Sequence, residues 1–359
     1  MTRTRPLFLV THQLRQPAVE VLAPAVDVVH ALPEDQRALL ASPDEDGARA
    51  RLMRERVLEL LPAASALHSI GRVDAELLDL GSRLRVVVVP GSGYDNVDVA
   101  AATARGIPVV HAAGSAYEPV AEHAIGLMLS LTKWIAVTDR RAHRERRGQS
   151  NRAMLLGLAP MPSTLHGKTL GIIGFGFIGR SLAQKCRDAF AMRVLAHDPY
   201  FDEAEAARLG VELCPLDEVL ATSDVVSVNS PLTPETHHLI GEEQLASMKP
   251  TALLVNTARG GLVDTDALTS ALTAGTIAGA GLDVTEPEPL PEGHPLFSLD
   301  NVVLTPHVAG ISDVFMAQNA RNTSADALAV LRGERPRRMV DPSVWPAYLE
   351  RLAALASDA

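Results

Sequence analysis

Three side chains in the second half of the sequence have the types that proton-coupled chemistry on a small acid requires. Arg259, Glu288 and His307 each lie in a loop that follows an expected β-strand. An arginine is always charged, and its planar guanidinium can hold a carboxylate through two parallel hydrogen bonds. A histidine titrates near neutral pH and can give or take a proton, and a carboxylate on its other ring nitrogen fixes its tautomer. Taken one at a time, arginines, glutamates and histidines in loops are mostly solvated. The inference of a catalytic group therefore depends on all three residues lying at strand ends.

A glycine-rich turn predicts a dinucleotide site beside them. The run KTLGIIGFGFIG at 168–179 combines an apolar strand, 169–173, with Gly174, Gly176 and Gly179 in G-x-G-x-x-G spacing and a following helix. These glycines allow a tight turn, a close approach of the pyrophosphate and close packing of helix on strand, while the helix N-terminus attracts the phosphates. Asp198 ends the next expected strand about 24 residues after Gly174, where an acid can bind a ribose hydroxyl. With this cofactor, the three side chains fit hydride transfer between a nicotinamide and a 2-keto or 2-hydroxy acid.

The elements that must position these residues alternate between strand and helix, which indicates parallel sheets. After Asp198, strands are expected at 224–229, 252–256, 277–282 and 302–304, a helix capped by Asp264 at 265–274, and a last helix at 312–331. Earlier strands are expected at 7–10, 26–29, 66–70, 85–89 and 108–110, helices at 44–61 and 75–80, and one helix of about five turns from Pro119. The tail beyond residue 331 gives no clear pattern.

One loop of the first half also carries chemistry. Residues 90–98, PGSGYDNVD, follow a strand, and the backbone N–H groups around Ser92 and Gly93 could bind a carboxylate. A structural turn before a helix capped by Asp98 fits the residues equally well.

Composition limits the class of protein. With 359 residues, 47 % of them hydrophobic, the chain is long enough for two domains. The net charge of −10 argues against nucleic acid or an anionic membrane as a partner, and the arginine-rich run 140–147 is better explained as a solvated helix end than as an anion site. Two cysteines, the short apolar run at the N-terminus and the lack of a membrane-length segment indicate a cytoplasmic protein.

Taken together, the motifs resemble the D-2-hydroxyacid dehydrogenase family, which includes D-3-phosphoglycerate dehydrogenases and hydroxypyruvate reductases. The resemblance covers roughly residues 66–333. It is carried by GSGYDNVD at Gly91, VAEHAIGLML at Val120, the glycine run, SPLTPETHHLIG at Ser230, VNTARGGLVD at Val255, and GAGLDVTEPEP through LTPHVAG between Gly279 and Gly310.

The resemblance implies an α/β fold of two doubly wound parallel-sheet domains, usually dimerised. A flavodoxin-like substrate-binding domain would comprise 1–111 and 311–359, and a Rossmann NAD-binding domain 112–310. Arg259 would bind the substrate acid with the backbone of Ser92 and Gly93, and His307 would be the acid–base group with Glu288 as its partner. The cofactor contacts would be Gly174, Gly176, Phe177, Ile178, Gly179, Asp198, Pro231, Thr257, Ala258, Asp283 and Gly310.

Departures from the family pattern refine the expectations. Ala116 and Asn229 stand where the family usually has Asn and often has His. The segment 68–70 offers only His68 where phosphoglycerate dehydrogenases carry basic residues, so a phosphorylated substrate is not expected unless arginines of the run 140–147 supply the charge. Asp198 favours NAD over NADP. No metal site is expected at His237-His238, because adjacent side chains point apart on most elements.

Two other functions remain open on the sequence. An NAD(H)-sensing, corepressor-like protein of the same fold would retain similar catalytic residues, although no basic interaction tail is evident. A dehydrogenase for an inorganic oxyanion would also use an arginine like Arg259.

Overall fold

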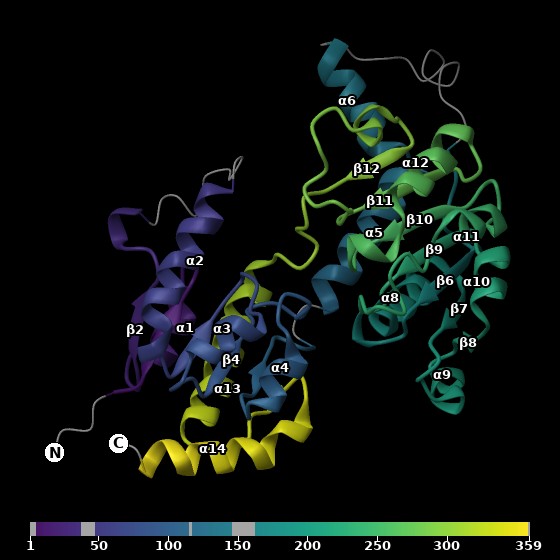
Figure 1. Ribbon diagram of the computed structural model, residues 1–359. Helices are drawn as coiled ribbons and strands as arrows, with labels where there is room; N and C mark the ends of the chain where they lie inside the picture. Colours follow the sequence, from purple (N-terminus) through teal and green to yellow (C-terminus); the bar gives the residue numbers. More distant parts are fainter. Residues whose placement is uncertain (1–4, 37–46, 115–116, 146–161, 358–359) are drawn as a thin grey trace. The chain divides into compact units, whose positions relative to one another are not determined.

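The computed structural model describes residues 5–36, 47–114, 117–145 and 162–357. The chain forms two compact units: Met1–Ala116 with Ser312–Ala359 (unit 1), and Tyr117–Ile311 (unit 2) (Figure 1). The assignment of substrate binding to residues 1–111 and 311–359, and of NAD binding to 112–310, stays a prediction.

Unit 1 is a parallel sheet covered by helices. Its described strands are β1 Leu7–Val10, β2 Asp27–His30, β3 Ala66–His68, β4 Val86–Val88 and β5 Val109–Val110. Its described α-helices are α1 Gln16–Leu22, α2 Ala48–Leu60, α3 Ala75–Leu80, α4 Val99–Ala104, α13 Asp313–Leu331 and α14 Trp345–Ser357. The strand order β2-β1-β3-β4-β5, all parallel, is the flavodoxin-like order.

Both faces of this sheet are buried because successive strand residues point to opposite sides. Phe8 and Val10 pack with Leu328 and Tyr348 of α13 and α14. Leu9, between them in sequence, packs instead in the cluster on the side of α2 and α3. The strands therefore read as continuous apolar runs rather than as alternating ones.

Unit 2 is a second doubly wound sheet. Its described strands are β6 Thr169–Ile173, β7 Arg193–His197, β8 Glu212–Leu213, β9 Val225–Val228, β10 Leu253–Asn256, β11 Gly279–Leu282 and β12 Val302–Leu304. Its described α-helices are α5 Tyr117–Thr132, α6 Ile135–Glu145, α8 Phe177–Phe190, α9 Glu203–Arg208, α10 Leu216–Thr222, α11 Glu242–Ser247 and α12 Thr265–Ala274. The parallel order β12-β11-β10-β9-β6-β7-β8 is the Rossmann order with one further strand, so the predicted fold class is confirmed.

The long helix expected from Pro119 is instead two helices. Trp134 has φ 58°, a left-handed conformation that ends the helical path between α5 and α6, and the two helices meet at 64°. No single described helix is long and apolar enough to cross a membrane, whereas this bent pair passes by length and composition alone. Ala121, Ala124 and Met128 of α5 are fully buried in the core of unit 2.

The remaining differences concern the end of the chain and the arginine-rich run. The tail contains α14, which is anchored by the buried Tyr348, whose hydroxyl donates to the carbonyl of Val330. From the run 140–147, Arg140 and Arg141 pair with Asp300 at 3.8 and 2.6 Å. Residues 146–147 lie outside the described part of the chain, as does Ala116.

Candidate active site

Because the strands of unit 2 are all parallel, their carboxyl ends lie along one edge of the sheet. Many of the predicted site residues of the unit closely follow these strand ends. They are Gly174 after β6, Asp198 after β7, Pro231 after β9, Thr257, Ala258 and Arg259 after β10, Asp283 after β11 and His307 after β12. Chain segments far apart in sequence are thus brought together by topology (Figure 1).

The glycine loop has the local geometry that a dinucleotide site requires. Gly174 has φ 89°, and a Cβ there would lie 2.6 Å from the backbone N of Ser230. A Cβ at Gly179 would lie 2.5 Å from the carbonyl oxygen of Gly174, so both positions need glycine for packing. A Cβ at Gly176, the residue before α8, would meet no atom within 4 Å. That open space, at a helix N-terminus, fits a pyrophosphate.

Two buried polar atoms at the same edge also fit a bound cofactor. Among the described residues, Thr257 Oγ1 and Asn229 Oδ1 are buried and have no hydrogen-bond partner. They follow β10 and β9, which are neighbours in the sheet. An unpartnered buried polar atom is costly unless a ligand or water supplies the missing bond. The residues present therefore fit a nicotinamide dinucleotide.

Asp198 is tied to the glycine loop. Its Oδ2 accepts a hydrogen bond from the backbone N–H of Phe175 at 2.8 Å, and its Oδ1 accepts one from the backbone N–H of Tyr200 at 3.0 Å. A carboxylate has about four acceptor positions. Asp198 can thus brace the loop and still accept a ribose hydroxyl.

Alanine substitutions at Gly174 and at Gly176 should have different effects, because a Cβ is crowded at the first position and meets open space at the second. We expect Gly174→Ala to lower the midpoint of thermal unfolding, because its φ and the contact with Ser230 cannot accept a Cβ. We expect Gly176→Ala to leave the unfolding midpoint of the free protein unchanged but to raise the Kd for NADH about tenfold or more, by filling the pyrophosphate space. Differential scanning fluorimetry and NADH fluorescence titration measure the two effects, and equal loss of stability in both variants would contradict this assignment.

Glu288 and His307 form the central pair of the site. His307 Nδ1 lies 2.7 Å from Glu288 Oε1, and both side chains are about half exposed, at 47 and 43 %. If Nδ1 donates its proton to the carboxylate, Nε2 is left for exchange of a proton with a ligand. His307 also has φ 53°, a conformation uncommon outside glycine, and its backbone N–H donates to the carbonyl of Asp283 at 2.8 Å.

Asp283 organises the segment that carries His307. It is 2 % exposed, and its carboxylate accepts hydrogen bonds from Thr305 Oγ1 at 2.6 Å, Val308 N at 2.9 Å and Ala309 N at 2.8 Å. His123 of α5 lies 2.9 Å from Thr305 Oγ1 and extends the network. His123 and Thr305 lie within the motifs at Val120 and Gly279–Gly310 but were not predicted as site residues, because nothing in a sequence links positions 182 residues apart.

The backbone around Arg259 is held by a residue that was also not predicted. Asn256, 1 % exposed, donates from Nδ2 to the carbonyl of Arg259 at 2.8 Å and accepts from Ala258 N at 3.0 Å. A Cβ at Gly260 would lie 1.9 Å from the carbonyl oxygen of Thr285. The Arg259 turn is therefore packed on the segment that leads to Glu288.

The remaining predicted residues belong to other segments of the chain. Ser92 and Gly93 belong to unit 1, in the loop after β4, where the carbonyl of Ser92 faces His111 Nδ1 at 2.8 Å. Phe177 and Ile178 begin α8, and Gly310 follows the segment held by Asp283. The proposed roles of all these residues stay predictions.

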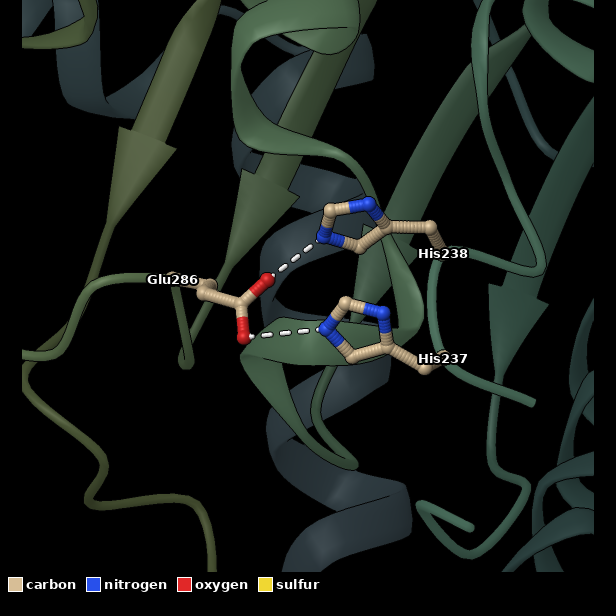
Figure 2. A group of neighbouring side chains, drawn as sticks. All are labelled: His237, His238 and Glu286. Carbon is tan, nitrogen blue, oxygen red and sulfur yellow. Dashed lines mark hydrogen bonds and ion pairs between the residues drawn. The ribbon is translucent and has the colours of Figure 1, made fainter. Parts of the chain in front are cut away.

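The expectation that His237 and His238 point apart is wrong. His238 has φ 53°, and Figure 2 shows both imidazole rings turned toward the carboxylate of Glu286. The left-handed residue reverses the usual divergence of adjacent side chains.

Comparison with known proteins agrees with this geometry. The profile described as D-isomer specific 2-hydroxyacid dehydrogenase, NAD binding domain, matches residues 125–309. The chain is 41 % identical to a glyoxylate reductase of Korarchaeum cryptofilum over 84 % of this chain and 89 % of that protein. It is 39 % identical to a D-3-phosphoglycerate dehydrogenase of Archaeoglobus fulgidus over 83 % of this chain but only 56 % of that protein.

Solved structures give the same result. A protein of Thermus thermophilus has a TM-score of 0.79 and 35 % identity, with 93 % of this chain and all (100 %) of that chain covered. An NADPH-dependent glyoxylate/hydroxypyruvate reductase of Sinorhizobium meliloti, in complex with NADP and malonate, has a TM-score of 0.76 and 30 % identity, covering 95 and 98 % of the two chains. The chain therefore belongs to the D-isomer-specific 2-hydroxyacid dehydrogenases, NAD-binding oxidoreductases of the CH–OH group of 2-hydroxy acids.

Proposed function

We propose that this protein catalyses the reversible reduction of a small, unphosphorylated 2-keto acid, of which glyoxylate is the simplest, with NADH as the reductant. The observation that carries the proposal is the Glu288–His307 pair, 2.7 Å apart, at the sheet edge that also carries the glycine loop. The bound nicotinamide would supply the hydride.

The chain's own residues would act on the proton and the charge of the substrate. His307, with Nδ1 held by Glu288, donates a proton from Nε2 to the carbonyl oxygen during reduction and takes it back during oxidation. Arg259 holds the substrate carboxylate and stabilises the charge that grows on the reacting oxygen. Asn256 and Asp283 keep the backbones of these two residues in place.

The choice of an unphosphorylated acid is supported by the carboxyl ends of β1 and β3. Burial lowers the pKa of His68 well below its usual value of 6.5, and repulsion by His12 adds to this effect. Burial, with a smaller contribution from His30, lowers the pKa of His12 to about 4. Both imidazoles are thus neutral at pH 7, so this segment offers no cation to a substrate phosphate.

The choice of NAD is supported by Asp198, whose carboxylate at the end of β7 would repel a 2′-phosphate. A cytoplasmic location and a homodimer formed through unit 2 are proposals that accompany this function, drawn from the composition and the family. Light scattering on the purified protein tests the second.

The decisive experiment is NADH oxidation with a panel of acids: glyoxylate, hydroxypyruvate, pyruvate, phenylpyruvate and phosphohydroxypyruvate. We expect turnover of glyoxylate or hydroxypyruvate, a lower kcat/KM for phosphohydroxypyruvate, and weaker activity with NADPH. Tight NADH binding without turnover of any acid would contradict the proposal and favour an NAD(H)-sensing, corepressor-like role.

A further inference from the structure

A cluster of two histidines and a glutamate lies in unit 2, outside the Glu288–His307 pair (Figure 2). His238 Nε2 is 2.6 Å from Glu286 Oε2, and His237 Nε2 is 3.3 Å from Glu286 Oε1. The rings are stacked, with 3.9 Å between their centroids and 21° between their planes. We call His237, His238 and Glu286 the His–His–Glu cluster.

The backbone holds the cluster together before any ligand arrives. The N–H of His238 donates to the carbonyl of Gly261 at 2.7 Å. A Cβ at Gly261 would come within 3.0 Å of Glu286 Oε1 and 3.3 Å of His237 Cδ2, so glycine leaves the room that the three side chains occupy. The convergence therefore comes from the fold and not from flexible surface side chains that meet by chance.

His238 lies between two carboxylates. Its Nδ1 lies 3.7 Å from Asp264 Oδ2, while its Nε2 faces Glu286. A cation between Nε2 and the carboxylate would leave the Nδ1 proton to Asp264.

We propose that the His–His–Glu cluster binds a divalent transition-metal ion of the zinc class. Its ligands would be Nε2 of His237, Nε2 of His238 and a carboxylate oxygen of Glu286, with water completing the shell. Imidazole and carboxylate are the ligands that Zn²⁺ takes, and three protein ligands with an open position are a common set. The residue that orients His238 from outside the shell would be Asp264, as carboxylates do for metal-bound histidines.

The separations suit such an ion after a small adjustment. Each ligand atom of the cluster lies within 4.8 Å of the others. Tetrahedral Zn²⁺ with bonds of about 2.0–2.1 Å keeps its ligand atoms roughly 3.3 Å apart. The distance from His237 Nε2 to Glu286 Oε1 is 3.3 Å and that from His238 Nε2 to Oε2 is 2.6 Å, so the carboxylate must turn to bring one oxygen to this separation from both nitrogens. The rings are 48 and 38 % exposed, so the ion can enter from solvent.

A second group with metal-ligand types is a poorer candidate. Glu212, Cys214 and Glu218 also place ligand atoms within 4.8 Å of one another. Burial, with the nearby Glu218 and Glu212, raises the pKa of the Cys214 thiol. Because the thiolate is the form that binds metals, this group is disfavoured.

Binding would join two segments of unit 2. His237 and His238 belong to the segment that pairs with 261–264, and Glu286 lies two residues before Glu288 in the sequence. An ion that binds the folded form alone raises its stability. This inference concerns binding only and does not depend on the proposed hydride transfer.

The test is calorimetric titration of ZnCl₂ into the full chain, prepared without a histidine tag and dialysed against a chelator. We expect one equivalent to bind and the midpoint of thermal unfolding to rise. His238→Asn and Glu286→Gln should each weaken binding at least about tenfold. With Co²⁺ as the probe, the visible spectrum should show the intense absorption of a tetrahedral site and lose it in the same variants.

Two matched controls make the result specific. His143 is an exposed histidine 3.2 Å from Asp139 but has no second histidine beside it, so His143→Asn should bind Zn²⁺ as the natural chain does. Cys214→Ser should do the same. The unfolding midpoints without metal show that the variants are folded. Absence of Zn²⁺ binding in the natural chain, or unchanged affinity in folded His238→Asn and Glu286→Gln, would overturn the proposal.

Discussion

Replacing His307 by asparagine is expected to lower kcat for keto-acid reduction about 10²–10⁴-fold, the usual contribution of a general acid–base group. Asparagine retains a polar side chain but cannot carry the proton that the reacting oxygen needs. Stopped-flow and steady-state measurement of NADH oxidation would show the loss. The Kd for NADH should stay unchanged, because the side chain of His307 contacts Glu288 and not the glycine loop. That loop is held by Asp198, which the substitution leaves in place.

Glu288→Gln is the matched variant for this prediction. Glutamine fills the same space and can still accept from His307 Nδ1, but it lacks the charge that stabilises the protonated ring. We expect a smaller loss of kcat than for His307→Asn, with the same NADH affinity. If either variant kept full kcat on the acid that the natural chain turns over, the Glu288–His307 pair would not be the acid–base group.

The fold class was predictable because two independent signals agreed. The G-x-G-x-x-G spacing indicates a strand, a turn and a helix around residue 174, and the alternation of apolar runs with helical segments continues on both sides. Strand bounds were less predictable, as 66–70 and 85–89 are reduced to β3 and β4 of three residues each. The apolar pattern continues past the point where the ladder hydrogen bonds stop.

Two single-residue backbone conformations could not be predicted from the sequence. Trp134 ends α5 and His238 turns two rings to one side, and both adopt positive φ without being glycine. Tryptophan does not indicate such a conformation and histidine indicates it only weakly, because tertiary contacts impose it against local preference. Helix α14 was not predicted either. It is held in place by the packing of Tyr348 in the core of unit 1, whereas its sequence carries no cap or periodic charge pattern that would indicate a helix.

The position of the candidate residues in loops after strands was predictable, whereas the contacts that support them were not. Resemblance pointed to Glu288 and His307, and the structure places them in hydrogen-bond contact. The roles of Asn256 and Asp283 in holding backbones emerge only when N–H groups from loops distant in sequence are placed in space. Such contacts have no sequence spacing, so they could not be derived from one chain.

Arg259→Gln is expected to lower kcat/KM for the keto acid about 10²–10³-fold, with effects on both KM and kcat. The guanidinium would hold the substrate carboxylate before reaction and stabilise the oxygen during it, so both ground-state and transition-state binding are lost. Asn256 holds the main chain at Arg259, and glutamine can adopt the same backbone conformation, so the loss should not come from unfolding. Steady-state kinetics and the unfolding midpoint measure both quantities.

Arg193→Gln is the control for loss of a positive charge in the same unit. Arg193 begins β7, at the edge opposite the site, and forms an exposed ion pair with Glu212 at 2.7 Å. An exposed ion pair contributes little to stability, so this variant should keep natural kinetics. Arg259→Lys should fall between the natural chain and Arg259→Gln, because lysine keeps the charge but loses the planar fork. Added guanidinium ion should restore part of the activity of Arg259→Gln. It should not raise the activity of Arg193→Gln. An Arg259→Gln enzyme with natural KM and kcat would show that another group binds the substrate acid.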